Sequence, residues 1–120
     1  MTDVINLEAK LASFNTHWDP KIVGELNGQQ VRLAKFQGEF IWHAHENEDE
    51  LFLVLSGSFD MHFPDRIETV NEGEFIIVPR GVQHCPCAKE EVHVLLFEPA
   101  ETLNTGNTGG PRTLTDLEQI

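Results

Sequence analysis

The sequence is poor in basic residues and contains no long apolar run. Lysine and arginine number 8 against 20 aspartate and glutamate residues, a net charge of −12 in a chain of 120 residues. A field of this sign repels phosphate groups, so we expect neither nucleic acids nor anionic membranes as partners. No stretch approaches the ~18 apolar residues of a membrane span, and the N-terminal MTDVINLEAK lacks the features of a signal peptide. We therefore expect a cytoplasmic protein, and the length is that of one domain.

Cysteine is scarce as well. The two cysteines, Cys85 and Cys87, are separated by a single proline. A disulfide between them would close a very small ring, whereas the Cα atoms of disulfides usually lie ~5.5 Å apart. We therefore expect two reduced thiols with a structural role. Because side chains alternate along a strand, both should point away from His84, toward the outer face or a subunit contact.

The sequence does contain a series of short β-rich runs. They are QQVRLAKF, GEFIW, LFLVLSG, SFDMHF, EFIIVP and EVHVLLFEP. Turn-forming residues such as Asn27-Gly28 and Pro79-Arg80-Gly81 lie between them. Short strands at such regular turn spacing are typical of an all-β antiparallel sandwich or barrel.

Three regions are expected along the chain: a lead-in with a short helix (residues 1–28), a barrel (29–98), and a C-terminal loop and tail (99–120). The helix prediction depends on apolar residues at helical spacing, with Thr2 or Asp3 as the cap. These residues are Val4, Leu7, Leu11 and Phe14. The tail ends in a second apolar stripe, which must pack on the barrel or on a neighbouring subunit because so short a segment is not stable alone. This stripe is Leu114, Leu117 and Ile120.

Two histidines one residue apart precede an acidic loop. On a strand, His43 and His45 would project to the same side, and imidazoles placed in this way are potential metal ligands. Glu50 follows after a turn, and His84 follows the second tight turn. Together these four side chains suit a divalent transition metal. The other histidines, His17, His62 and His93, are expected to be ordinary structural residues.

These residues stand in a pattern that resembles the cupin superfamily. The first motif reads Gly38, a four-residue spacer, His43-Ala44-His45, four residues, Glu50, six residues and Gly57. The second reads Gly73, five residues, Pro79-Arg80-Gly81, two residues and His84. The spacer after Gly38 is one residue shorter than usual, and Ala88 stands where an asparagine often ends the second motif. The resemblance covers about residues 30 to 98, and more loosely the following tail.

The resemblance implies a small antiparallel jelly-roll barrel that holds one divalent metal ion, which the sequence does not identify as Fe, Mn, Zn or Ni. His43, His45, Glu50 and His84 would be the ligands. Small cupins commonly form homodimers, and the apolar face of VHVLLFEP with the tail stripe offers a surface for one. The sugar-epimerase branch commonly uses a tyrosine, and this chain contains none.

Three functions remain open: a metal-dependent, dioxygenase-like oxidoreductase acting on a small molecule, a cupin that binds metal and ligand without turnover, and a metal-dependent isomerase of a sugar-like substrate. Arg80, Gln83 and Trp42 are candidate substrate contacts. Four aromatic residues are candidates for packing in or around the barrel, with an ordinary core role as the alternative. They are Phe40, Trp42, Phe52 and Phe75.

Overall fold

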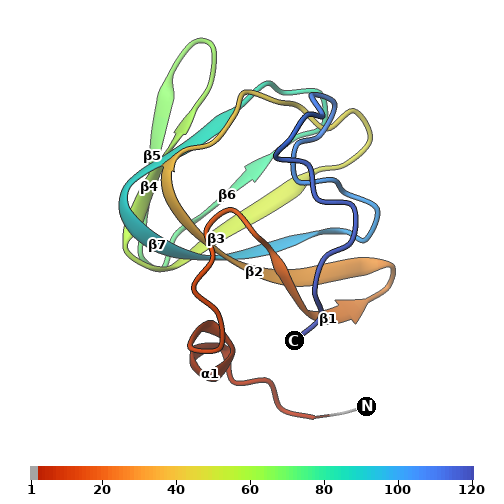
Figure 1. Ribbon diagram of the computed structural model, residues 1–120. Coiled ribbons are helices and arrows are strands. Elements are labelled where there is room, and N and C mark those ends of the chain that lie inside the picture. Colours follow the sequence, from red (N-terminus) through yellow and green to blue (C-terminus); the bar gives the residue numbers. More distant parts are fainter. Residues whose placement is uncertain (1–2) are drawn as a thin grey trace.

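Seven antiparallel strands curl into a barrel in the computed structural model, which describes residues 3–120 (Figure 1). This arrangement confirms the predicted all-β jelly-roll class with one short helix. The elements in chain order are α1 (Leu7–Leu11), β1 (Lys21–Leu26), β2 (Gln29–Glu39), β3 (Glu50–Ser56), β4 (Ser58–His62), β5 (Ile67–Asn71), β6 (Phe75–Val78) and β7 (Cys85–Pro99).

Strand β7 connects the two sides of the barrel. It pairs with β2 along most of its length, with β3 through its second half, and with β4 through Cys85–Cys87. The strand order is β1-β2-β7-β3-β6, with β4 and β5 attached beside this path. Register shifts at Phe36/Gly38 and Val54/Ser56 bend the strands, as β-bulges do in closed sheets.

Alternating residues of the central strands face two separate cores. The inward residues of β2, β3 and β7, such as Ala34, Val54 and Val94, belong to the main core inside the barrel. The residues between them, such as Leu33 and Leu95, pack outside against the N-terminal helix. Because both faces of β2 are covered, its buried residues run almost without interruption from Gln30 to Phe36.

The N-terminal helix is shorter than predicted. It spans Leu7–Leu11 and is capped by Asn6, whose side chain accepts a hydrogen bond of 2.9 Å from the Ala9 amide. The expectation of a helix from residue 3 was wrong, because Val4 is 96% exposed and has no core to pack on. The alternative cap Thr2 lies outside the described residues.

The C-terminal tail packs on the barrel, one of the two alternatives predicted. It is extended, and Ile120 donates a backbone hydrogen bond of 3.0 Å to Ile22 of β1. The Ile120 side chain joins the outer core beside the N-terminal helix. Within residues 3–120, no helix is both long and apolar enough to cross a membrane.

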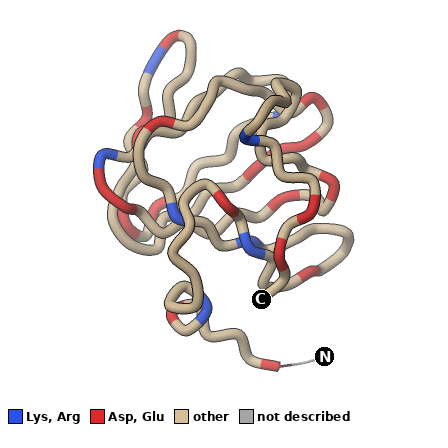
Figure 2. Tube along the Cα trace, viewed as in Figure 1, with Lys and Arg blue, Asp and Glu red and all other residues tan. Residues whose placement is uncertain are grey.

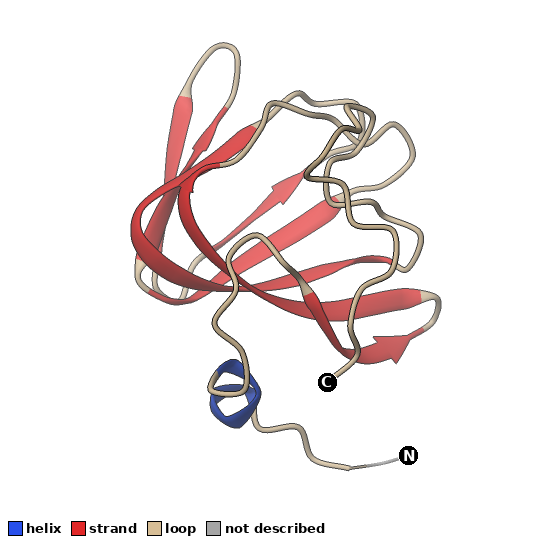
Figure 3. Cartoon of the chain, in the orientation of Figure 1, coloured by secondary structure: helices blue, strands red, loops and turns tan. Residues whose placement is uncertain are grey.

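Loops gather at one end of the barrel, where residues 40–49, 79–84 and 100–113 meet (Figure 3). Acidic residues are spread along the chain, whereas basic residues are few (Figure 2). The predicted ligands all lie at this end.

Candidate metal centre

The His43–His45 segment is irregular, and the expectation that it forms a strand was wrong. Its one bridge joins His43 to His84. The His43 amide donates to the His84 carbonyl at 3.0 Å, and the His84 amide donates back at 2.9 Å. The His45 carbonyl accepts a 2.7 Å hydrogen bond from Gly81, within the turn that Pro79 opens. The two histidine motifs are therefore joined directly through their backbones.

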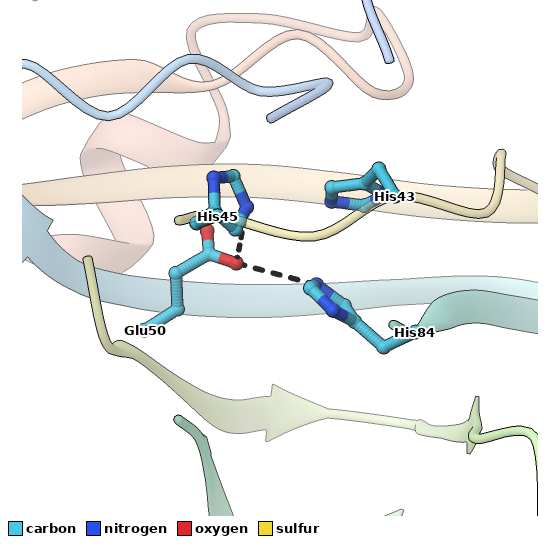
Figure 4. Close-up of side chains that lie close together, drawn as sticks. All are labelled: His43, His45, Glu50 and His84. Atoms are coloured by element: carbon cyan, nitrogen blue, oxygen red, sulfur yellow. Dashed lines mark ion pairs between the residues drawn. The ribbon is translucent and has the colours of Figure 1, made fainter. Parts of the chain in front are cut away.

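The structure brings the four predicted ligands together. One potential ligand atom from each of His43, His45, Glu50 and His84 lies within 4.8 Å of the others, and all four residues are buried. Glu50 Oε1 is 2.7 Å from His45 Nε2 and 3.4 Å from His84 Nε2. Figure 4 shows the carboxylate of Glu50 turned toward the three rings. The four side chains thus form one group, which we call the ligand cluster.

Several polar atoms of the ligand cluster lack a hydrogen bond. His45 Nδ1, His45 Nε2, Glu50 Oε1 and His84 Nε2 are buried without one. Buried polar atoms are rarely left unpaired, and such a set calls for an explanation such as a bound ion. Three imidazoles and a carboxylate are a donor set that Fe, Mn, Zn or Ni accepts. The residues therefore fit one divalent metal ion.

Backbone carbonyls orient two of the imidazoles. His43 Nδ1 lies 2.9 Å from the Ile41 carbonyl, and His84 Nδ1 lies 2.9 Å from the Val82 carbonyl. Because a carbonyl only accepts, Nδ1 must carry the proton in both rings. The Nε2 lone pair of each ring is left free for a metal.

The ionisation of the cluster also suits a cation. Burial, together with the neighbouring His84, lowers the pKa of His43 to about 4, so its ring is neutral at neutral pH. Burial alone would raise the pKa of Glu50, but close polar contacts with Glu98, His45 and His84 hold it well below its usual range. The cluster therefore offers a neutral imidazole at His43 and an ionised carboxylate at Glu50.

Glu98 and Arg32 form a second buried polar group. The sequence analysis did not predict either residue as part of the site. Arg32 Nη1 donates to Glu98 Oε1 at 2.7 Å, and both side chains are 2% exposed. Burial and the adjacent Glu50 carboxylate raise the pKa of Glu98 well above its usual range, an effect that Arg32 opposes. Glu98 thus links Arg32 to the ligand cluster.

A signal for this pair was present in the sequence. Val94 and Leu96 are every second residue of β7 and face the main core, and the next residue on that side of the strand is Glu98. On β2, Arg32 has the phase of Ala34, which faces the main core. A charged residue at an inward position of a strand indicates a buried ion pair or a site, because isolated charges are not buried.

An apolar cavity adjoins the ligand cluster. Its volume is about 30 Å³, enough for one or two molecules of the size of water. Its walls are mainly aromatic and aliphatic, with polar groups at one side. The lining residues are Trp18, Pro20, Phe36, Phe40, His43, Glu50, Phe52, Pro86, Leu96, Glu98 and Asn104.

A polar groove of about 220 Å³ lies against His45. It is bordered by the acidic loop after His45 and by the C-terminal tail. The lining residues are His45, Glu46, Asn47, Glu48, Glu101, Leu103, Gly106 and Asn107.

Arg80, Gln83 and Trp42 are not among the residues that line the apolar cavity. Arg80 is exposed and pairs with Asp49 at 3.3 Å, Gln83 is exposed, and Trp42 is 44% exposed. Their role as substrate contacts stays a prediction. Of the aromatic candidates, Phe40 and Phe52 line the cavity, whereas Phe75 lies outside the core at 60% exposure.

The placement of the cysteines differs in part from the prediction. Both thiols are free, as expected, but Cys85 is 1% exposed, so the expected position on the outer face was wrong for this residue. Three consecutive residues, His84 to Pro86, are buried because both sides of the strand are covered there. Burial raises the pKa of the Cys85 thiol to about 12, which makes it unreactive.

Comparison with known proteins identifies relatives of the chain. Residues 29–98 match the family described as Cupin domain. A cupin-2 domain protein from Shewanella frigidimarina is 43% identical, with a TM-score of 0.79 over 80% of this chain and 94% of that one. Protein NMB1881 from Neisseria meningitidis is 31% identical, with a TM-score of 0.75 over 82% of this chain and 100% of that one.

A curated relative matches over a shorter stretch. The uncharacterized protein YdbB of Bacillus subtilis is 40% identical over 63 residues, which are 52% of this chain and 56% of YdbB. The match thus spans a little more than half of the length of that relative. The family match, the two structures and the buried histidine–glutamate cluster agree, and the chain belongs to the cupin family.

Proposed function

We propose that this cupin is a mononuclear metal-dependent enzyme, a dioxygenase-like oxidoreductase acting on a small organic molecule. The observation that carries the proposal is a set of buried, unpaired ligand atoms beside an apolar cavity. A bound divalent ion with open positions would supply either dioxygen activation or Lewis-acid chemistry. The cavity has room for a molecule of the size of dioxygen beside His43 and Glu50.

The walls of the cavity favour an uncharged, apolar group no larger than dioxygen or a small part of a substrate. Trp18 stacks on Phe36 and Phe40, with ring centroids 4.4 and 4.8 Å apart, and these rings face the cavity beside Phe52. Two cations near this group already have partners: Arg32 donates to Glu98 and to backbone carbonyls, and Arg112, which lies over the Phe40 ring, donates to the Glu39 carbonyl. A phosphorylated substrate would find no free positive partner among the lining residues.

Elemental analysis tests the metal centre. We expect the purified protein to contain about one transition-metal ion per chain and the His45→Ala variant to lose it, because His45 supplies one of the converging ligand atoms. His62→Ala is the matched control, since His62 is partly exposed on β4 and lies outside the cluster. Equal metal content in the wild-type and His45→Ala proteins would exclude this site.

Oxygen uptake separates the three functions left open by the sequence. Consumption of dioxygen with a panel of catechols and thiols, lost in His45→Ala, would support the oxidoreductase. Tight ligand binding without product would instead favour a binding protein, and product formation without oxygen uptake would favour an isomerase. Each result points to one class.

The homodimer and the cytoplasmic location stay predictions. Strand β7, proposed as a dimer surface, lies between β2 and β3, and its Val92, Val94 and Leu96 are core residues. The last strand in the sheet order, β6, supports a dimer better because Phe75 and Ile77 are 60% and 52% exposed. Light scattering of the wild-type and Phe75→Glu proteins tests this dimer. We expect the mass of two chains for the wild-type protein and of one chain for Phe75→Glu. The mass of one chain in both proteins would argue against a dimer.

A further inference from the structure

The C-terminal tail contacts the residue between the two histidine ligands. The Ala44 amide donates to Asn107 Oδ1 at 3.1 Å, and the Ala44 carbonyl accepts from the Asn107 amide at 2.9 Å. A single tail residue thus satisfies both backbone polar groups of Ala44. On either side, His43 pairs with His84 and His45 pairs with Gly81. The irregular segment is therefore held by three backbone partners instead of a continuous strand.

Gly106 brings the tail unusually close to this segment. A β-carbon at this position would lie 2.2 Å from the Ala44 carbonyl oxygen and 3.2 Å from His43 Cδ2. No side chain fits there unless the backbone moves, because real contacts of this kind are much longer. The next residues continue the contact, since Thr108 Oγ1 donates to the Trp42 carbonyl at 2.9 Å. The approach of the tail thus depends on a glycine at position 106.

The tail is itself fixed by Asn104. This side chain accepts from the Leu114 amide and donates to the Arg112 carbonyl, both at 2.8 Å. Arg112 in turn donates to the Glu39 carbonyl at 3.2 Å and lies over the Phe40 ring. Asn104 therefore joins the two ends of this loop to each other, and Arg112 attaches the loop to the barrel next to the ligand cluster.

We propose that Gly106 and Asn107 are positioning residues that set the orientation of His43 and His45 for metal binding. The inference rests on the metal centre of the proposed function. It extends that centre beyond residues 29–98, the part that matches the family. A shift of Ala44 would move both imidazoles together, because one lies on each side of it. Metal affinity should therefore depend on the tail although the tail supplies no ligand.

Titration with Co²⁺, followed by visible absorption, tests the inference because the spectrum reports coordination geometry as well as affinity. We expect Asn107→Ala and Gly106→Ala to bind Co²⁺ about 10- to 100-fold more weakly, the usual effect of losing an outer-shell partner, with a changed spectrum. Gly109→Ala is the matched control. Gly109 also has a positive φ of 67°, but a β-carbon there would meet nothing within 4 Å.

The outcomes distinguish the two proposals. Wild-type protein that binds no Co²⁺ would overturn the metal centre and this inference with it. Wild-type affinity and spectrum in a folded Asn107→Ala protein would overturn the positioning role alone. If Gly106→Ala does not fold, as judged by circular dichroism of the metal-free protein, Asn107→Ala decides the matter by itself.

Discussion

Two polar groups are buried side by side in the barrel, and they differ in how completely the protein satisfies them. In the first, which we call the arginine cluster, the Arg32 guanidinium donates to Gln30, Glu98 and the carbonyls of Ala100 and Thr102. In the ligand cluster, buried nitrogen and oxygen atoms of three side chains have no hydrogen bond. The Arg32 guanidinium finds its partners within the protein, although Glu98 Oε2 beside it has none, whereas the ligand cluster leaves four buried atoms unpaired and calls for another partner.

Structural and functional polar residues lie together in this core and have to be told apart. Burial alone does not do so, since Arg32 and His84 are 1% and 0% exposed. The distinction lies in the hydrogen bonds: the Arg32 guanidinium is satisfied and stabilises the fold, whereas several unpaired atoms that converge on one point indicate a site. Glu98 belongs to both groups, because it accepts from Arg32 and contacts Glu50.

The largest expected effect concerns the arginine cluster. Arg32→Met should lower the free energy of unfolding by ~3–5 kcal/mol, because it removes the buried partner of Glu98 and leaves the polar groups around it unpaired. Urea denaturation of the metal-free protein measures the change. Arg66→Met, which removes an exposed arginine, serves as the control and should leave the midpoint unchanged. An equal midpoint in both variants would contradict a structural role for the arginine cluster.

The second-largest expected effect is a pH dependence of the free energy of unfolding, caused by the ligand cluster in the metal-free protein. The pKa of His43 falls from 6.5 to about 4 on folding, so between these values the unfolded chain takes up a proton that the folded chain does not. Stability should therefore be full above pH 6.5 and fall as the pH is lowered toward 4, by up to ~3 kcal/mol. Urea denaturation between pH 4 and 7 tests this.

Two variants show whether the pH dependence of stability comes from His43. His43→Gln should flatten the pH dependence, whereas His62→Gln should keep it. Glu98, whose raised pKa acts in the opposite sense, is present in all three proteins, so the difference between them belongs to His43. The same slope in His43→Gln would show that this ring is not buried in its neutral form.

The smallest expected effect is stabilisation of the protein by a bound metal ion. It tests whether the metal is the missing partner of the ligand cluster. A divalent ion at 100 times its Kd should stabilise the wild-type protein by ~2.7 kcal/mol, and His84→Ala should gain nothing. Thermal unfolding with the ion and with a chelator measures this. If the ion stabilises Arg32→Met as much as the wild-type protein, the two clusters are independent. A smaller stabilisation would show that Glu98 couples them.

Much of the site was predictable from the sequence, because the H-x-H spacing and the two turns are local features. Glu50 begins β3 directly after the acidic loop, and His84 follows the Pro79–Gly81 turn, as predicted. The predictions failed where burial depends on distant segments. Nothing local shows that Cys85 is covered, or that Val4 lies beyond the reach of the barrel.

Residue type and short spacing were enough to predict the all-β class, the turns and the four candidate ligands. How these four side chains are held depends on the tertiary structure. Asn107 closes on Ala44, and Arg32 pairs with Glu98, across more than sixty positions in each case. The inward phase of Arg32 and Glu98 predicts that each is buried, but the sequence does not show which partner either residue meets, since a hydrogen bond depends on where folding brings two distant segments together.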